Sequence, residues 1–119
     1  MFINLSNHPS EKWDTKQKEA AALYGEVVDL PFPQIPADAD EQYVDELSTT
    51  YCDFVLEHDH PVVMVQGEFT FTYLVIKKLK EHGIAVITSC SERQTKEWVD
   101  ETGRQIKQNV FEFVRFRRY

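Results

Sequence analysis

The chain has 119 residues, of which 42% are hydrophobic, so it is long enough for one domain with its own core. Eight Phe, five Tyr and two Trp argue against disorder, and no apolar run is long enough to cross a membrane. The net charge of −7 excludes a general DNA or RNA binder, because such binding depends on neutralising phosphates.

The charge is unevenly distributed along the chain. Residues 1–60 carry 13 acidic and three basic side chains, a net charge of −10, whereas residues 61–119 carry ten basic and seven acidic ones, a net charge of +3. Three arginines, Arg115, Arg117 and Arg118, cluster at the end. They form either a small basic face for an anionic ligand or a solvated strand end.

The start of the chain and its cysteines indicate a cytoplasmic protein. Residues 1–6 lack the basic segment and long apolar run of a signal peptide. Cys52 and Cys90 have no CxxC partner, so we expect free, buried thiols in a reducing compartment. We therefore expect one cytoplasmic domain over residues 1–119, with no membrane contact and no cofactor.

The first elements are a strand, a helix and a second strand. Residues 2–5 are apolar and predict a strand that ends at residues 6–9. A helix follows, with Asp14 as its cap, Gln17 completing a capping box and Gly25 closing it. The apolar side of this helix is expected to hold Ala20, Ala21, Leu23 and Tyr24. Residues 26–30 predict the second strand.

A proline-rich connector and a longer helix come next. Three prolines in residues 31–36 forbid a helix and favour extended backbone. Asp38 or Asp40 is expected to cap the following helix. Its buried face is predicted from side chains at helical spacing, namely Tyr43, Val44, Leu47, Tyr51, Phe54 and Val55.

Two strands follow in which apolar residues do not alternate with polar ones, as expected for strands covered on both faces. Residues 61–66 predict the third strand, and residues 84–88 predict the fourth. The helix between them spans residues 69–82 and ends at Gly83. Residues 89–93 are expected to form a loop.

The tail predicts a β-hairpin over residues 96–117. A loop at Thr102-Gly103 would place Val99 opposite Ile106. Right-handed strand–helix–strand connections then give an α/β fold with a short parallel sheet of order 2-1-3-4, helices on both faces and an antiparallel C-terminal hairpin at one edge.

Ligands of such sheets bind beyond the carboxyl ends of the strands, where the strand order reverses. Here that point lies between the first and third strands. The segments expected to converge there supply the candidate ligand-binding residues: Ser6, Asn7, Gln66, Gly67, Glu68, Phe69, Thr70, Ser89 and Ser91.

Several of these residues have a structural alternative. His8 could act as general acid or base, or be only a turn residue before Pro9. The amides that open the third helix could hold phosphate, although Glu68 would repel it and could instead cap the helix. Arg93 could bind an anion or lie in solvent.

Other chemistries have little support in the sequence. His58, Asp59 and His60 resemble metal ligands but lie at the opposite end of the sheet from the expected site, so we predict no metal site. GxGxxG, P-loop and GxSxG motifs are absent, which disfavours common nucleotide-binding and hydrolase classes.

The segment Phe2-Ile3-Asn4-Leu5-Ser6-Asn7-His8-Pro9, followed at once by a helix, resembles the small stand-alone proteins of type III CRISPR loci. Residues 65–70 and 88–93 fall where such proteins contact ligand. The resemblance covers the topology of nearly the whole chain and implies a three-layer, Rossmann-like (CARF-like) domain of the ring-nuclease group.

The resemblance implies binding of a cyclic oligoadenylate by a homodimer, and metal-independent cleavage by attack of a ribose 2′-OH on the adjacent phosphate. It suggests His8 and Arg93 as catalytic residues, with Arg93 and the helix amides on phosphate and Asn7 and Ser89 on ribose. Two alternatives stay open, a nucleotide-sensing or sequestering module without turnover, and a protein-interaction domain without a small ligand.

Overall fold

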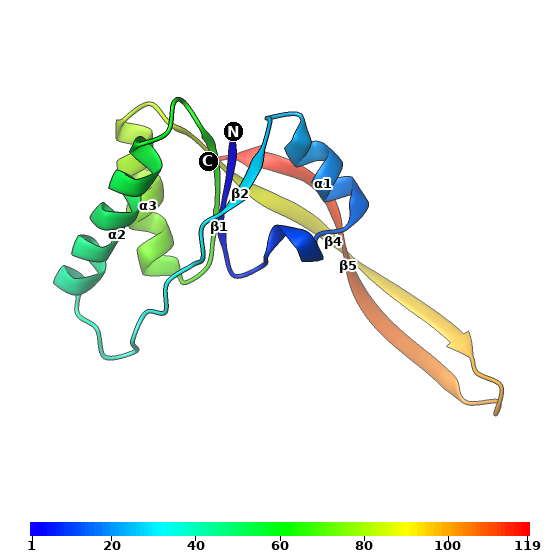
Figure 1. Ribbon diagram of the computed structural model, residues 1–119. Helices are drawn as coiled ribbons and strands as arrows, with labels where there is room; N and C mark the ends of the chain where they lie inside the picture. Colours follow the sequence, from blue (N-terminus) through cyan, green and yellow to red (C-terminus); the bar gives the residue numbers. More distant parts are fainter.

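The computed structural model describes all 119 residues and contains one five-stranded mixed sheet (Figure 1). The strand order is β2-β1-β3-β4-β5; the first four strands are parallel and β5 is antiparallel to β4, so the predicted α/β topology is confirmed. In chain order the elements are β1 (Phe2–Ser6), a 3-10 helix (Ser10–Lys12), α1 (Thr15–Ala22), β2 (Val27–Asp29), α2 (Glu41–Leu56), β3 (Val62–Gln66), α3 (Phe69–Glu81), β4 (Ala85–Val99) and β5 (Gln105–Arg118).

Helices cover both faces of the sheet. Alternate residues of each strand point to opposite sides, and the strands are apolar on both sides, so each face needs a covering layer. Helices α2 and α3 bury one face, and α1 lies on the other, as Figure 1 shows. The core under α2 and α3 includes Ile3, Leu5, Val63, Val65, Phe71 and Val75. The core on the α1 side consists of Phe2, Trp13, Ala21, Met64, Ile87, Phe113 and Phe116. This is the three-layer, Rossmann-like arrangement.

Helix α1 begins as the sequence predicts. The Asp14 carboxylate accepts a hydrogen bond of 2.8 Å from the Gln17 backbone N–H, and Gly25 has the positive φ of 106° expected after the helix. The Gln17 side chain, however, turns into the protein instead of completing a capping box. Leu23 is also not on the buried side, since 88% of it is exposed.

Helix α2 is capped by Asp40, which accepts a hydrogen bond from the Tyr43 N–H. Its buried residues are Val44, Ser48, Cys52 and Val55. The expected positions of Tyr43 and Phe54 on this face are wrong: both side chains are exposed, because the contact with α3 and the sheet follows a narrower stripe.

Lys78 of α3 forms hydrogen bonds with α2. Its ammonium donates to the carbonyl and carboxylate of Asp45 at 2.8 and 2.9 Å and to the hydroxyls of Ser48 and Thr49 at 2.6 and 2.8 Å. This cation therefore stabilises the packing of the two helices rather than serving a ligand.

The proline-rich residues 31–36 cross the sheet at the carboxyl ends of β1 and β3. The Phe32 ring packs edge-on against Phe71, with ring centres 5.1 Å apart. It also lies directly against Gly67, where any Cβ would overlap it. The segment is thus fixed over the end of the sheet by one aromatic side chain.

Strand β4 does not end where the sequence predicts. Residues 89–93, expected as a loop, continue as strand to Val99 because β5 supplies backbone partners along the whole length. The hairpin register also differs: Trp98, not Val99, lies opposite Ile106, and the connecting loop spans residues 100–104. Asp100 holds this loop by accepting hydrogen bonds from the Thr102 and Arg104 amides.

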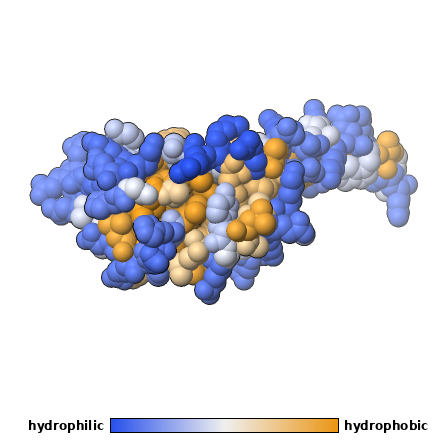
Figure 2. All heavy atoms as spheres, turned by 90° about the horizontal axis from the view of Figure 1, so that it is seen from above, coloured by the Kyte–Doolittle hydropathy of each residue, from blue (hydrophilic) through white to orange (hydrophobic).

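The outer part of this hairpin, residues 92–112, forms an arm that extends away from the body (Figure 1). The arm raises the radius of gyration to 17.4 Å, against about 13–14 Å for a compact chain of this length. Figure 2 shows the arm as a narrow, mostly hydrophilic projection with hydrophobic atoms near its end. Its exposed apolar residues are Trp98, Val99 and Phe111.

None of the three α-helices combines the length and the apolar character needed to cross a lipid bilayer.

Candidate functional site

A partly buried hydrogen-bond network fixes the turn that follows β1. The Asn4 side chain donates to the His8 carbonyl at 2.9 Å and to the Asp29 carboxylate at 3.0 Å, and accepts from the Ser6 hydroxyl at 2.6 Å. The Trp13 indole N–H donates to the same His8 carbonyl at 3.1 Å. The backbone of His8 is therefore held rigidly, while its side chain is exposed at the rim.

A cleft of about 280 Å³ opens beside this turn, on the α1 side of the sheet. It brings together six of the predicted site residues, from the ends of β1 and β3 and from Ser89 within β4. Its lining consists of Ser6, Asn7, His8, Trp13, Gln17, Met64, Gln66, Gly67 and Ser89. We call it the α1-side cleft.

Polar side chains from β3, β4 and α1 shape this cleft. The Gln66 side-chain oxygen accepts hydrogen bonds from the Ser89 hydroxyl at 2.7 Å and the Ser89 amide at 3.2 Å. The buried Gln17 side chain makes one hydrogen bond, a long one of 4.0 Å to the Met64 sulfur. Gln17 therefore keeps hydrogen-bonding capacity for a molecule bound in the cleft.

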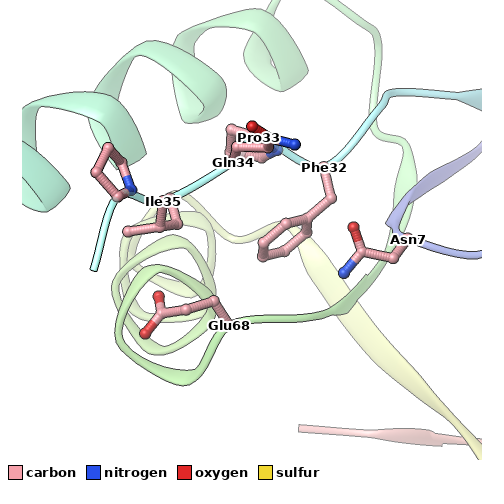
Figure 3. A pocket seen from close by; sticks show the side chains of 7 residues that line it. Asn7, Phe32, Pro33, Gln34, Ile35 and Glu68 are labelled. Carbon is pink, nitrogen blue, oxygen red and sulfur yellow. The ribbon is translucent and has the colours of Figure 1, made fainter.

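A second cleft, of about 540 Å³, lies on the other side of the same turns, under the proline-rich segment. Figure 3 shows the Phe32 ring pointing into it between Asn7 and Ile35, with Glu68 across from the segment. Its lining consists of Asn7, Phe32, Pro33, Gln34, Ile35, Pro36 and Glu68. We call it the strap cleft. Because Asn7 lines both clefts, they adjoin at the point where the strand order reverses.

The family model of the uncharacterized protein MJ1673 family matches residues 1–117, nearly the whole chain. The chain belongs to the MJ1673 family. A search of curated proteins finds no match to it.

In this MJ1673-family chain, Glu68 caps helix α3. Its carboxylate accepts hydrogen bonds from the amides of Thr70 and Phe71 at 2.9 and 2.8 Å and from the Thr70 hydroxyl. Slight desolvation acts to raise the pKa of Glu68, but these hydrogen bonds outweigh it and lower the pKa below 4.5. The amides proposed as a phosphate cradle are thus occupied by the protein's own carboxylate, and Thr70 serves the cap.

Phe69, Ser91 and Arg93 line neither cleft. Phe69 is 88% exposed and lies in a shallow depression between α2 and α3. Arg93 is four strand residues beyond Ser89, a distance of about 13 Å at the usual rise of a strand. The prediction that residues 89–93 form a loop beside the site is wrong, because β4 continues through them into the arm.

The electrostatics of the two clefts differ. His8 is the one ionisable side chain lining the α1-side cleft, and Glu68 is the one lining the strap cleft. No Lys or Arg lines either, since Arg115, Arg117 and Arg118 lie on the edge strand β5. Residues 58–60 do not form a cluster of metal ligands. No three His, Cys, Asp or Glu side chains come together, and the Asp59–His60 pair is exposed.

Sequence reasoning missed the walls of both clefts. The local sequence predicts Gln17 as part of a helix cap and Phe32 as part of a stiff connector, so neither belongs to the predicted site. Two features of the sequence could have indicated them. One is a glutamine in the first turn of the first helix, and the other is an aromatic residue between prolines after the second strand. Gln17 lies in the helix that follows β1, and Phe32 lies in the segment that follows β2. Both strands end at the carboxyl rim of the sheet.

Proposed function

We propose that this chain binds a small anionic nucleotide, a cyclic oligoadenylate, at the carboxyl rim of its sheet. One observation carries the proposal: two adjoining clefts, whose linings include side chains with free hydrogen-bonding groups, meet at Asn7 where the strand order reverses. Open α/β sheets bind nucleotides at this position. The resemblance of the segment around Asn7 to CRISPR-associated proteins suggests the cyclic class of nucleotide.

Cleavage of the ring is the further step of this proposal. A ribose 2′-oxygen attacks the adjacent phosphorus, the bond to the 5′-oxygen breaks, and a 2′,3′-cyclic phosphate remains. His8 takes the proton from the 2′-OH and, as the imidazolium, gives a proton to the leaving 5′-oxygen. Asn7 and Ser89 position the ribose. The exposed His8 side chain, on a backbone fixed by Asn4 and Trp13, supports this role.

A homodimer is part of the proposal, because a two-fold axis suits a symmetric ring. The arm is the surface we assign to it, since an isolated two-stranded ribbon is only marginally stable in water and this one exposes Trp98 and Phe111. In such a dimer we assign Arg93, which lies on the arm and lines neither cleft, to a phosphate of the ring bound by the second copy.

The test uses purified protein with cyclic tetra- and hexa-adenylate in the presence of EDTA. Binding followed by release of linear products with 2′,3′-cyclic phosphate ends is the expected result. In His8→Ala, binding should persist and cleavage should fall by about 10²–10⁴-fold. Absence of binding by the wild-type protein to either ring contradicts the whole proposal.

Binding without turnover is the second candidate function, and one observation favours it. No cation lines either cleft, so a single chain has little to stabilise the extra negative charge of a transition state. Intact rings recovered after prolonged incubation, with equal affinity in wild type and His8→Ala, would select a sensing or sequestering module.

A further inference from the structure

The two clefts at the rim differ in the kind of chemical group that they suit. Phe32, Pro33, Ile35 and Pro36 give the strap cleft apolar walls, whereas five of the nine residues that line the α1-side cleft have hydroxyl or amide side chains. Resting on the proposed function, we propose that the strap cleft is the subsite for a nucleobase with an exocyclic amine, adenine, and that Phe32 is its stacking platform.

The Phe32 ring is held in one orientation before any ligand arrives. It lies against the backbone of Gly67 and meets the Phe71 ring edge-on, at an interplanar angle of 79°. The prolines on either side restrict the backbone that carries it. Flat aromatic rings stack on nucleobases, and a fixed ring loses little conformational entropy when it does so.

Polar groups around the platform match the edge of adenine. The side chains of Asn7 and Gln34 line the cleft, and each offers one acceptor oxygen and an NH₂ donor. Such amides can pair with the N6 amine and N7 of adenine at once. The Glu68 carboxylate already accepts hydrogen bonds from Thr70 and Phe71, but its negative charge still favours the amine of adenine over the O4 oxygen of uracil.

Charge then fixes the direction of the nucleotide across the rim. Glu68 repels phosphate from the strap cleft, while the α1-side cleft has no carboxylate and has His8 at its edge. Gly67 lines the α1-side cleft and its neighbour Glu68 lines the strap cleft, so one turn separates the two. The base therefore lies toward α2 and α3, and the ribose and phosphate lie toward α1.

The test is NMR of the full chain with adenosine 5′-monophosphate (AMP) at millimolar concentration, and uridine 5′-monophosphate (UMP) as the competitor base. AMP should shift the Phe32 ring signals and the Gln34 side-chain amide, and the adenine H2 and H8 signals should move upfield. UMP should bind several-fold more weakly. Phe32→Leu should weaken AMP binding about tenfold, and Gln34→Ala, which removes an exposed side chain, should weaken it to a smaller extent.

Two matched variants control for general effects of the substitutions. Phe54→Leu and Gln42→Ala alter an exposed phenylalanine and an exposed glutamine of α2 and should leave AMP binding unchanged. The unfolding midpoint of each variant identifies any loss of fold. If Phe32→Leu is too unstable to measure, Gln34→Ala and the shift pattern of the wild type show whether AMP binds in the strap cleft.

The possible results separate this subsite from the proposed function. Shifts confined to other surfaces, or equal binding of AMP and UMP, would overturn the adenine subsite. Binding of cyclic tetra-adenylate that Phe32→Leu and Gln34→Ala leave unchanged would keep the function and remove the subsite. AMP binding at Phe32 with no binding of either ring would keep the subsite and remove the function.

Discussion

The ring of Phe32 lies directly against Gly67, so close that a Cβ at position 67 would overlap it. A residue between two prolines is thus in contact with the turn that follows β3, 35 positions along the chain. Glycine is needed here for this approach, since the φ of Gly67 is not among the positive values of the chain. The contact therefore holds the proline-rich residues 31–36 against the candidate site.

Gly67→Ala should therefore displace Phe32 and cost about 1–3 kcal/mol of stability, as overpacked sites do. Urea unfolding measures the loss. The double variant Gly67→Ala, Phe32→Ala should be less destabilised than the sum of the two single changes, because the overlap disappears with the ring. Additive losses in this cycle would show that the two residues do not constrain each other.

Asn4 should be the polar residue on which the geometry of the rim depends most. Asn4→Ala removes three hydrogen bonds and leaves the buried Ser6 hydroxyl and His8 carbonyl with fewer partners, at an expected cost of about 1–3 kcal/mol. Asn109→Ala is the control: it removes an exposed partner of Thr95 on the arm, and should change stability by less than about 0.5 kcal/mol. Equal losses would contradict the structural role of Asn4.

The sequence predicts the sheet well because its buried strands differ sharply from their surroundings. Residues 62–65 and the start of β4 are continuous apolar runs, which lie between two helical layers as expected. From that order, the meeting of Ser6, Asn7, Gln66 and Ser89 follows without any motif, since β1 and β3 end at one rim and β4 passes Ser89 beside the end of β3.

The arm and the cleft walls could not be predicted in the same way. Residues 91–99 are exposed on both faces, so neither burial nor alternation marks them as a strand; only pairing with β5 does. Gln17 and Phe32 reach the site through tertiary packing, from a helix and from an irregular segment. Their local sequence indicates only a cap and a stiff connector.

The stability of the protein should depend on the ionisation of Glu68 in acid. Hydrogen bonds lower the pKa of Glu68 in the folded state, so its stabilising effect is present above about pH 4.5 and is lost as the pH falls through the lowered pKa. The cap is exposed and should contribute only about 1 kcal/mol. An NMR titration of the Glu68 carboxyl should give a midpoint below 4.5.

Thr70→Val provides the matched variant for this titration. It removes the hydroxyl that donates to Glu68 and retains both backbone amides, so the midpoint should rise toward the ordinary value. A midpoint at or above 4.5 in the wild-type protein, or one that Thr70→Val leaves in place, would contradict the capping account.

The two thiols should react at very different rates. Burial between α2 and α3 raises the pKa of the Cys52 thiol from 9.0 to about 11, partly offset by the nearby Lys78 ammonium. At pH 8 its thiolate fraction is then about a hundredfold below that of an ordinary thiol. Cys90 is half-buried and more accessible.

With a thiol reagent in excess, one fast and one slow phase should therefore be seen. Cys90→Ser should remove the fast phase, and denaturant should make both thiols react at once. A fast phase that persists in Cys90→Ser would show that Cys52 is not shielded in solution.

Removal of the arm tests whether it holds two copies together without supporting the body. The core on the α1 side uses Phe113 and Phe116 of β5 but no residue of the arm. Replacing residues 92–112 by a two-residue Asn-Gly turn between Ser91 and Phe113 should therefore leave the body folded, with a similar unfolding midpoint. Sedimentation should show a dimer for the full chain and a monomer for the shortened one. A full-length monomer, or a shortened chain that still dimerises, would exclude the arm as the interface, and loss of fold on shortening would show that the arm stabilises the body.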